Sequence, residues 1–206
     1  MMVYFYIIIY TLVLQPLVML RINVQINIQP IFTCVFAIFS QILHLIEFLY
    51  VFRMFVYRLA LDIKPSRKSM KRYIMEGVDW IRKQYKAYHN DVERMAELAE
   101  RAIFLLDNGK TDLENIGHLG EGWTGEEALA IALYCSLKHF DCFEDAMIAA
   151  VNHGGDSDST GAVTGNILGA AIGYEAIPQY YKDDLEMHDL ILHMADDLYR
   201  GQITEM

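Results

Sequence analysis

The segment from His153 to Gly161 reads HGGDSDSTG and combines two carboxylates with neighbouring hydroxyl groups. Asp156 and Asp158 are two residues apart, and Ser159 follows the second carboxylate. Mg²⁺ prefers carboxylate, hydroxyl and water oxygens as ligands, and the two glycines before Asp156 let the backbone turn tightly. We therefore expect Asp156, Asp158 and Ser159 to bind Mg²⁺, and His153 to pack or hydrogen-bond rather than to bind the metal.

The loop has two other interpretations. Asp156, Asp158 and Gly161 occupy positions one, three and six of a calcium EF-hand. Position twelve of that motif needs a bidentate glutamate, and here it is the apolar Ile167, which excludes the EF-hand. The second alternative is a helix cap, in which Asp158 or Ser159 only satisfies free N–H groups. Residue types alone leave the cap and the metal site both open.

Helical patterns dominate the sequence around this loop. Apolar residues at helical spacing, two capping-box patterns (Thr124 with Glu127, and Asp141 with Glu144) and a late proline, Pro178, mark the helices. They predict helices over residues 91–106, 124–137, 141–152, 160–176 and 182–199. No strand pattern of comparable strength is present. The predicted fold class is all-α.

The helix predicted after the loop carries a glycine at every fourth position: Gly161, Gly165, Gly169 and Gly173. Each glycine costs a helix about 1 kcal/mol relative to alanine. We therefore expect another backbone to approach this face closely. A pair of membrane helices would show the same pattern, but Asn166 interrupts the segment and the acidic loop precedes it, so close packing inside a helical domain is favoured.

Composition limits the class of protein. A chain of 206 residues is long enough for one domain. Its net charge of −10 and pI near 5.1 argue against a nucleic-acid binder, which needs clustered cations to neutralise phosphates. Cys34, Cys135 and Cys142 have no paired spacing, so neither a disulfide framework nor a zinc site is indicated. A reducing compartment, the cytoplasm, fits best.

The sequence changes character near residue 62. Residues 1–61 contain three arginines and one glutamate, a net charge of +2, whereas residues 62–206 have 14 basic and 26 acidic residues, a net of −12. All 13 glycines lie in the second part. We therefore divide the chain into a hydrophobic segment, 1–61, and a helical domain, 62–206.

Three interpretations of the hydrophobic segment remain open. Residues 1–52 contain two apolar runs that approach membrane-spanning length, and the basic residues that follow place the helical domain on the cytoplasmic side of a membrane hairpin. Alternatively, the runs are buried core helices, although they show no amphipathic period. The third interpretation is a mistranslated region, because such a composition results when an AT-rich reading frame is translated out of register.

Three blocks of the helical domain carry a resemblance to a known family. Residues 119–133 (LGEGWTGEEALAIAL), 153–161 and 165–169 (GNILG) resemble, in order and spacing, the C-terminal half of the ADP-ribosylglycohydrolases, which include the ADP-ribosyl-acceptor hydrolases. The resemblance implies an all-helical hydrolase with two Mg²⁺ ions. It also implies the substrate and partner: an ADP-ribosylated protein, often modified on arginine, or a related ADP-ribosyl compound.

The resemblance also assigns residues. Asp156, Asp158 and Ser159 match the Asp-x-Asp-Ser/Thr metal ligands of the family. The loop 122–126 matches a segment that lies against ADP-ribose, so the expected substrate-binding residues are Gly122, Trp123, Gly125 and Glu126. For Trp123, filling of the core is an equal alternative.

The chain also departs from the family. Members share a glycine-rich first helix and a Ser/Thr-Asp-Asp motif that supplies further metal ligands and, in several accounts, the acid/base carboxylate. Neither is present, and the adjacent pairs 183–184 and 196–197 lack the preceding Ser or Thr. No catalytic residue is therefore assigned. Besides a Mg²⁺-dependent hydrolase, the alternatives are an inactive remnant without the N-terminal ligands and a membrane-anchored interaction protein.

Overall fold

The structure is a computed structural model that describes residues 55–85, 89–183 and 185–201. Within these ranges the regular secondary structure is helical and no strand is present, which confirms the all-α prediction. After a helical stretch at residues 55–61, the elements are α4 (Arg67–Gln84), α5 (His89–Phe104), η3 (Leu105–Asp107), α6 (Asp112–Gly117), α7 (Gly125–Lys138), α8 (Phe143–Val151), α9 (Ser157–Ile172), η4 (Tyr174–Ala176), α10 (Tyr180–Asp183) and α11 (His188–Arg200).

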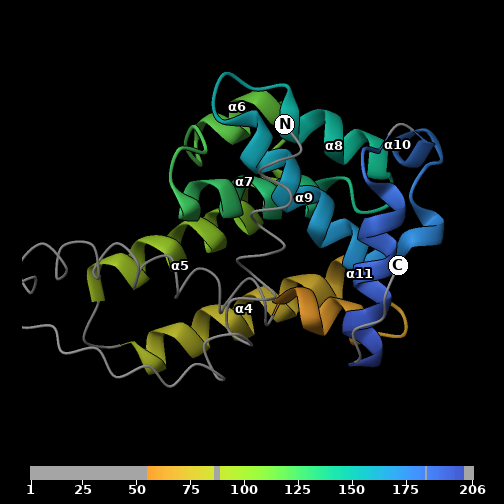
Figure 1. The fold of residues 1–206 in the computed structure, drawn as a ribbon. Coiled ribbons are helices and arrows are strands. Elements are labelled where there is room, and N and C mark those ends of the chain that lie inside the picture. Colours follow the sequence, from red (N-terminus) through yellow and green to blue (C-terminus); the bar gives the residue numbers. More distant parts are fainter. Residues whose placement is uncertain (1–54, 86–88, 184, 202–206) are drawn as a thin grey trace, which may run out of the picture.

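Helix α7 is the centre of the fold. Every residue from Ala128 to Leu137 is buried, so this helix has no polar face and must be surrounded by other elements. It packs against α5, α8 and α9, and Figure 1 shows α7 lying between α5 and α9. The loop before α7 leads into this helix, and the loop before α9 joins α8 and α9, which both pack against it.

A buried polar cluster joins α6 to α7. The hydroxyl of Tyr134, a fully buried residue, donates to Asp112 Oδ1 at 2.7 Å and accepts from Asn115 Nδ2 at 3.0 Å. The other oxygen of Asp112 lies 2.8 Å from His139 Nε2. Burial raises the pKa of Tyr134, so the phenol stays protonated and can donate. Because these groups satisfy one another inside the domain, they fix α6 relative to α7.

Thr124 is the N-cap residue of α7, as its pattern predicts, but neither predicted capping box forms. The side chain of Thr124 makes no capping hydrogen bond. Asp141 lies outside α8, whose N-cap residue is Cys142. Both capping-box predictions are therefore wrong, although α7 and α8 lie where helices were predicted. Capping boxes occur instead before α4 and α6, at Ser66 and Thr111.

The two C-terminal helices also differ from the prediction. Helix α9 begins at Ser157 and ends at Ile172, because Gly173 adopts a φ of +79° that leaves the helical region. The helix predicted over 182–199 is divided into α10 and α11. Met187 precedes α11 in the left-handed region, with a φ of 59°, which a continuous helix cannot include.

The glycines of α9 face side chains rather than another backbone. A Cβ atom on Gly161 would lie 2.7 Å from Val151 Cγ1, so the C-terminal end of α8 packs closely there. At Gly165 and Gly169 the nearest atoms are side-chain atoms at 3.8 and 3.9 Å, which is ordinary contact. Close packing inside the domain is present at Gly161, but the prediction that a second backbone approaches these glycines is wrong.

The core begins before residue 62. Phe55 and Leu59 are 3% and 0% exposed and belong to the main hydrophobic cluster. The interpretations of residues 1–54, including a membrane hairpin within 1–52, lie outside the described residues. Among the residues that are described, no helix is both long and apolar enough to cross a membrane.

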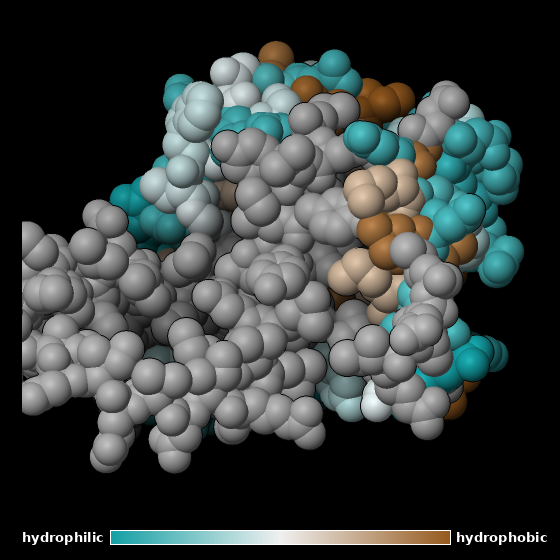
Figure 2. Space-filling view, in the orientation of Figure 1, coloured by the Kyte–Doolittle hydropathy of each residue, from teal (hydrophilic) through white to brown (hydrophobic). Residues whose placement is uncertain are grey.

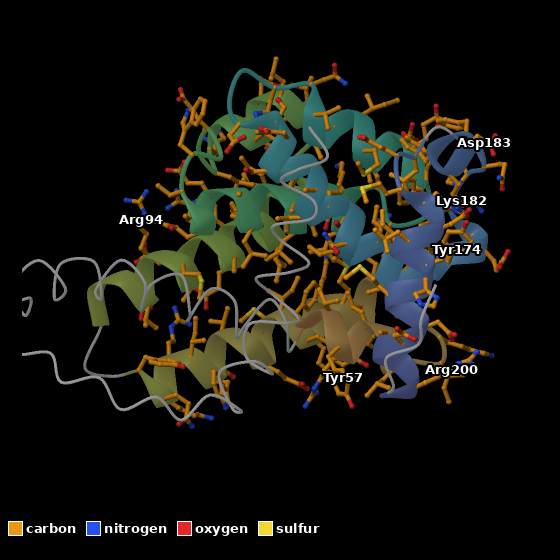
Figure 3. The ribbon with its side chains drawn as sticks, viewed as in Figure 1. Tyr57, Arg94, Tyr174, Lys182, Asp183 and Arg200 are labelled. Carbon is orange, nitrogen blue, oxygen red and sulfur yellow. The ribbon has the colours of Figure 1, made fainter. Side chains whose placement is uncertain are left out.

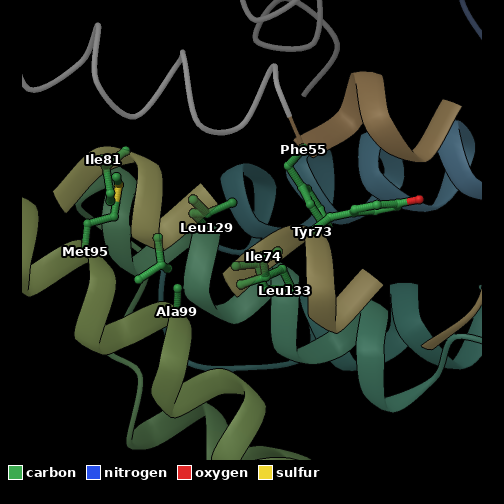
Figure 4. Close-up of a pocket in the computed structure, with 9 residues that line it drawn as sticks. Phe55, Tyr73, Ile74, Ile81, Met95, Ala99, Leu129 and Leu133 are labelled. Atoms are coloured by element: carbon green, nitrogen blue, oxygen red, sulfur yellow. The ribbon is translucent and has the colours of Figure 1, made fainter. Parts of the chain in front are cut away.

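A small apolar cavity lies in the core between α4, α5 and α7 (Figure 4). Its lining includes Phe55, Ile74, Met95 and Leu133. The volume of about 20 Å³ is far below the several hundred Å³ that a small-molecule ligand fills. This cavity is therefore a packing defect and not a substrate pocket.

A second cavity, of about 510 Å³, is open to solvent near α10 and α11, and its lining includes Gln179 and His188. Figure 2 shows hydrophilic residues interspersed with hydrophobic patches over the described surface on this side of the molecule. No residue of 120–126 or 153–161 lines either of these two cavities. The predicted site residues therefore lie outside both cavities.

Candidate functional site

The three predicted metal ligands meet at the start of α9. The carboxylate of Asp156 accepts a hydrogen bond from the backbone N–H of Ser159 at 3.4 Å, which makes Asp156 the N-cap residue. Burial raises the pKa of Asp156, but hydrogen bonds with the side chain of Asp158 and with Ser159 outweigh it, so the pKa lies below its usual value. Asp156, Asp158 and Ser159 thus lie together at the N-terminus of α9.

His153 and Thr160 hold the loop in shape. Nδ1 of His153 accepts from the backbone N–H of Gly155 at 3.1 Å, and its Nε2 lies 2.9 Å from the hydroxyl oxygen of Thr160. That hydroxyl, in a fully buried residue, donates to the carbonyl of Ala150 at 2.7 Å. These partners assign a proton to Nε2. The prediction that His153 forms hydrogen bonds is confirmed.

The loop before α7 lies directly against the loop before α9, which is predicted to bind the metal and is called the metal-binding loop below. The carbonyl of Glu121 accepts a hydrogen bond from the backbone N–H of Asp156 at 2.7 Å. A Cβ atom on Gly155 would lie 1.8 Å from that carbonyl oxygen, so only glycine fits there. Gly122 has a φ of +82°, and a Cβ atom there would lie only 3.0 Å from the methyl carbon of Thr160. The two segments predicted from sequence thus lie in direct contact.

The predicted substrate-binding residues occupy different surroundings. Gly122 is buried against the metal-binding loop. Trp123 is 68% exposed, and its indole N–H donates to Glu121 Oε2 at 3.0 Å, so the core-filling alternative is wrong. Gly125 is the first residue of α7 and is exposed. The carboxylate of Glu126 forms an ion pair at 3.2 Å with an arginine of α5. Contact of these residues with a substrate stays a prediction.

The donor set fits part of a site for a hard divalent cation. Two carboxylates that face each other repel unless a proton or a cation lies between them. No lysine or arginine within the described ranges forms an ion pair with Asp156 or Asp158. In the described part of the chain, no group of three or more His, Cys, Asp or Glu side chains could hold a metal ion. The loop thus offers two carboxylates and one hydroxyl, and water, a substrate or further protein groups must complete the coordination of Mg²⁺.

Comparison with known proteins identifies the family. The sequence profile of the ADP-ribosylglycohydrolases matches residues 50–205 of the chain. The chain belongs to the ADP-ribosylglycohydrolase family. The match covers both loops of the candidate site and reaches back beyond Phe55. No solved structure matches this ADP-ribosylglycohydrolase chain.

Several characterised relatives share part of its sequence. ADP-ribosylarginine hydrolase Tri1 of Serratia proteamaculans is 42% identical over 59 residues, which are 29% of this chain and 16% of the relative. Human ADP-ribosylhydrolase ARH3 is 24% identical over 125 residues, 56% of this chain and 33% of the relative. ADP-ribosyl-[dinitrogen reductase] glycohydrolase of Rhodospirillum rubrum is 43% identical over 47 residues, 23% of this chain and 16% of the relative. The chain thus matches a third or less of the length of each of these proteins.

Sequence reasoning missed the groups that hold this ADP-ribosylglycohydrolase site together. The carbonyl of Glu121 is a backbone group, and no residue pattern reveals its partner. The role of Thr160 depends on the end of α8 approaching α9, which is a tertiary contact. Glu127 carried a signal, as the last residue of a capping-box pattern, but the structure gives it another partner, the backbone N–H of Glu121 at 3.3 Å.

Proposed function

We propose that the chain supplies Asp156, Asp158 and Ser159 to the Mg²⁺ site of a hydrolase that releases ADP-ribose from an arginine-type side chain. The position of two carboxylates and a hydroxyl together at the N-terminus of α9 supports the proposal. The loop that the family resemblance places against ADP-ribose is joined to them by the Glu121 to Asp156 hydrogen bond. Substrate and metal would therefore meet at one surface.

The reaction is the hydrolysis of an N-glycosidic bond. The bond between the anomeric carbon and the guanidino nitrogen breaks with oxocarbenium character, water adds to the anomeric carbon, and the nitrogen leaves with a proton. When bound, Mg²⁺ would orient and polarise the reacting oxygens. The two carboxylates of this chain supply the negative charge that attracts the ion. Gly122 lets the two loops pack closely, and the exposed indole of Trp123 offers an aromatic surface beside them.

The names of the relatives support this substrate class. Tri1 is an ADP-ribosylarginine hydrolase, ARH3 is an ADP-ribosylhydrolase, and the R. rubrum relative acts on ADP-ribosyl-dinitrogen reductase. We extend this chemistry to the present chain. We also propose the cytoplasm as its compartment, because both described cysteines, Cys135 and Cys142, are free thiols, as a reducing environment allows.

Release of ADP-ribose tests the proposal. The full chain is incubated with an ADP-ribosylarginine peptide over a range of Mg²⁺ concentrations, and free ADP-ribose is quantified. Release that depends on Mg²⁺ and disappears in Asp158→Ala would support the proposal. Asp145→Ala, which removes an exposed carboxylate from the first turn of α8, is the matched control and should retain activity. Absence of release from the wild-type chain at every Mg²⁺ concentration would refute it.

One observation favours a second candidate function, the binding of Mg²⁺ and ADP-ribose without turnover. Within the described residues, only two carboxylates and one hydroxyl lie together at the site, which leaves no third carboxylate to act as an acid or a base. This candidate predicts that Mg²⁺ and ADP-ribose together raise the melting temperature while no product forms. A product that accumulates over several turnovers would exclude it.

A further inference from the structure

We infer that Glu127 is a positioning residue for the metal-binding loop, acting through the backbone of Glu121 and anchored by Arg94. The inference rests on the proposed function, because the loop it positions is the proposed Mg²⁺ site. Glu127 belongs to the first turn of α7 and lies outside both segments from which ligands were predicted.

Glu127 lies directly against the loop that precedes α7. Its Oε2 accepts a hydrogen bond from the backbone N–H of Glu121 at 3.3 Å. A Cβ atom on Gly120, which has a φ of +127°, would lie 2.5 Å from Cδ of Glu127. Gly120 thus leaves room for the carboxylate of Glu127. That carboxylate stabilises the backbone turn that follows Gly120 through its hydrogen bond with Glu121.

Arg94 of α5 fixes the same carboxylate from the other side. Its Nη2 lies 3.1 Å from Oε1 of Glu127, and its Nε lies 3.2 Å from Oε1 of Glu126. The side chain of Glu127 is only 17% exposed, whereas that of Arg94 is 57% exposed. Figure 3 shows Arg94 beside the beginning of α7. A largely buried carboxylate needs such partners. Here Oε1 pairs with Arg94, and Oε2 accepts the hydrogen bond from Glu121.

The backbone of Glu121 connects this carboxylate to the metal-binding loop. Its N–H is held by Glu127, and its C=O accepts the hydrogen bond from the N–H of Asp156 at 2.7 Å. Asp156 is the N-cap of α9 and interacts with Asp158 and Ser159. The contacts therefore run without a break from α5 through the start of α7 to the N-terminus of α9. If Glu121 moves, the Asp156 backbone loses its partner.

The test compares the Mg²⁺ midpoint of three variants, measured as the rise in melting temperature during a Mg²⁺ titration of the full chain. Groups that orient metal ligands typically change metal affinity by roughly 10- to 100-fold when they are removed. We expect Glu127→Ala to raise the midpoint by about 10-fold or more. Glu127→Gln keeps an oxygen that accepts from Glu121 and should recover most of the loss.

Glu100→Ala is the matched control. Glu100 also pairs with an arginine between two helices, at 2.6 Å from Arg82, but it has no contact with the loop. It should lower the melting temperature without changing the Mg²⁺ midpoint. An unchanged midpoint in Glu127→Ala, or an equal change in Glu100→Ala, would overturn the inference.

Failure of the proposed function remains distinguishable from failure of this inference. If the wild-type chain neither binds Mg²⁺ nor releases ADP-ribose, the proposed function fails. The inference is then decided by hydrogen exchange at the amide of Asp156, without metal. Exchange that accelerates in Glu127→Ala and not in Glu100→Ala supports the positioning role, and equal exchange in both variants refutes it.

Discussion

Replacing Gly155 by alanine tests the contact that joins the two loops of the site. A Cβ atom at this position would lie 1.8 Å from the carbonyl oxygen of Glu121 and 2.6 Å from its carbonyl carbon. Both are backbone atoms, which cannot rotate away as a side chain would. The loops must therefore separate, and the 2.7 Å hydrogen bond between Asp156 and Glu121 must break.

The expected loss of stability follows from these two effects. A hydrogen bond contributes about 0.5–1.5 kcal/mol, and forcing extra atoms into a filled space costs about 1–3 kcal/mol. Gly155→Ala should therefore reduce the free energy of unfolding by about 2–4 kcal/mol. For a chain of 206 residues this corresponds to a fall in melting temperature of roughly 5–15 °C. Urea denaturation followed by circular dichroism measures the first value, and calorimetry the second.

Gly154 provides the control in the same loop. A Cβ atom there would meet nothing within 4 Å, so Gly154→Ala should change the stability by less than about 1 kcal/mol. Gly155→Ala should also weaken Mg²⁺ binding, since it displaces Asp156. Equal stability of the two variants would show that the loops are not in contact as described.

Three further predictions concern the scaffold. Tyr134→Phe should cost about 1–3 kcal/mol in urea denaturation, because it removes the hydrogen bonds of the buried hydroxyl to Asn115 and Asp112. Leu137→Ala, at a fully buried position, should cost about 2–5 kcal/mol, whereas Leu113→Ala, at a position 62% exposed, should cost little. Hydrogen bonds from the side chain and backbone of Thr111 lower the pKa of Glu114, so this pair contributes stability that is present above the unfolded pKa and is lost as the pH falls through the folded one. An NMR titration of Thr111→Ala should show the Glu114 pKa rising towards its usual value.

The fold could be predicted where the sequence pattern is periodic. The amphipathic stretch of α5 and the apolar stretch of α7 appear where they were expected. The end of α9 was placed too late because nothing in the sequence shows that Gly173, unlike Gly161, takes a positive φ. The division between α10 and α11 depends on Met187 in the left-handed region, a conformation that its residue type disfavours.

The site was predictable to the extent that its groups are side chains close together in sequence. Asp156 is the N-cap of α9 and Asp158 belongs to its first turn, so the sequence itself places both carboxylates at the same helix end. The contact between the loops depends on Glu121 and Gly155, which are 34 residues apart and meet through a backbone carbonyl. Glu127 fits a local capping pattern, but in the tertiary structure its carboxylate accepts a hydrogen bond from Glu121 and pairs with Arg94 instead.

Titration calorimetry with Mg²⁺ decides whether the loop at the start of α9 is a metal site. The wild-type chain and Asp158→Ala are titrated in the presence of ADP-ribose. We expect saturable heat from the wild-type chain and none from the variant, because the variant lacks one of the two carboxylates at this helix end. No heat from the wild-type chain, or the same binding curve from both proteins, would contradict the assignment of Asp156, Asp158 and Ser159 as ligands.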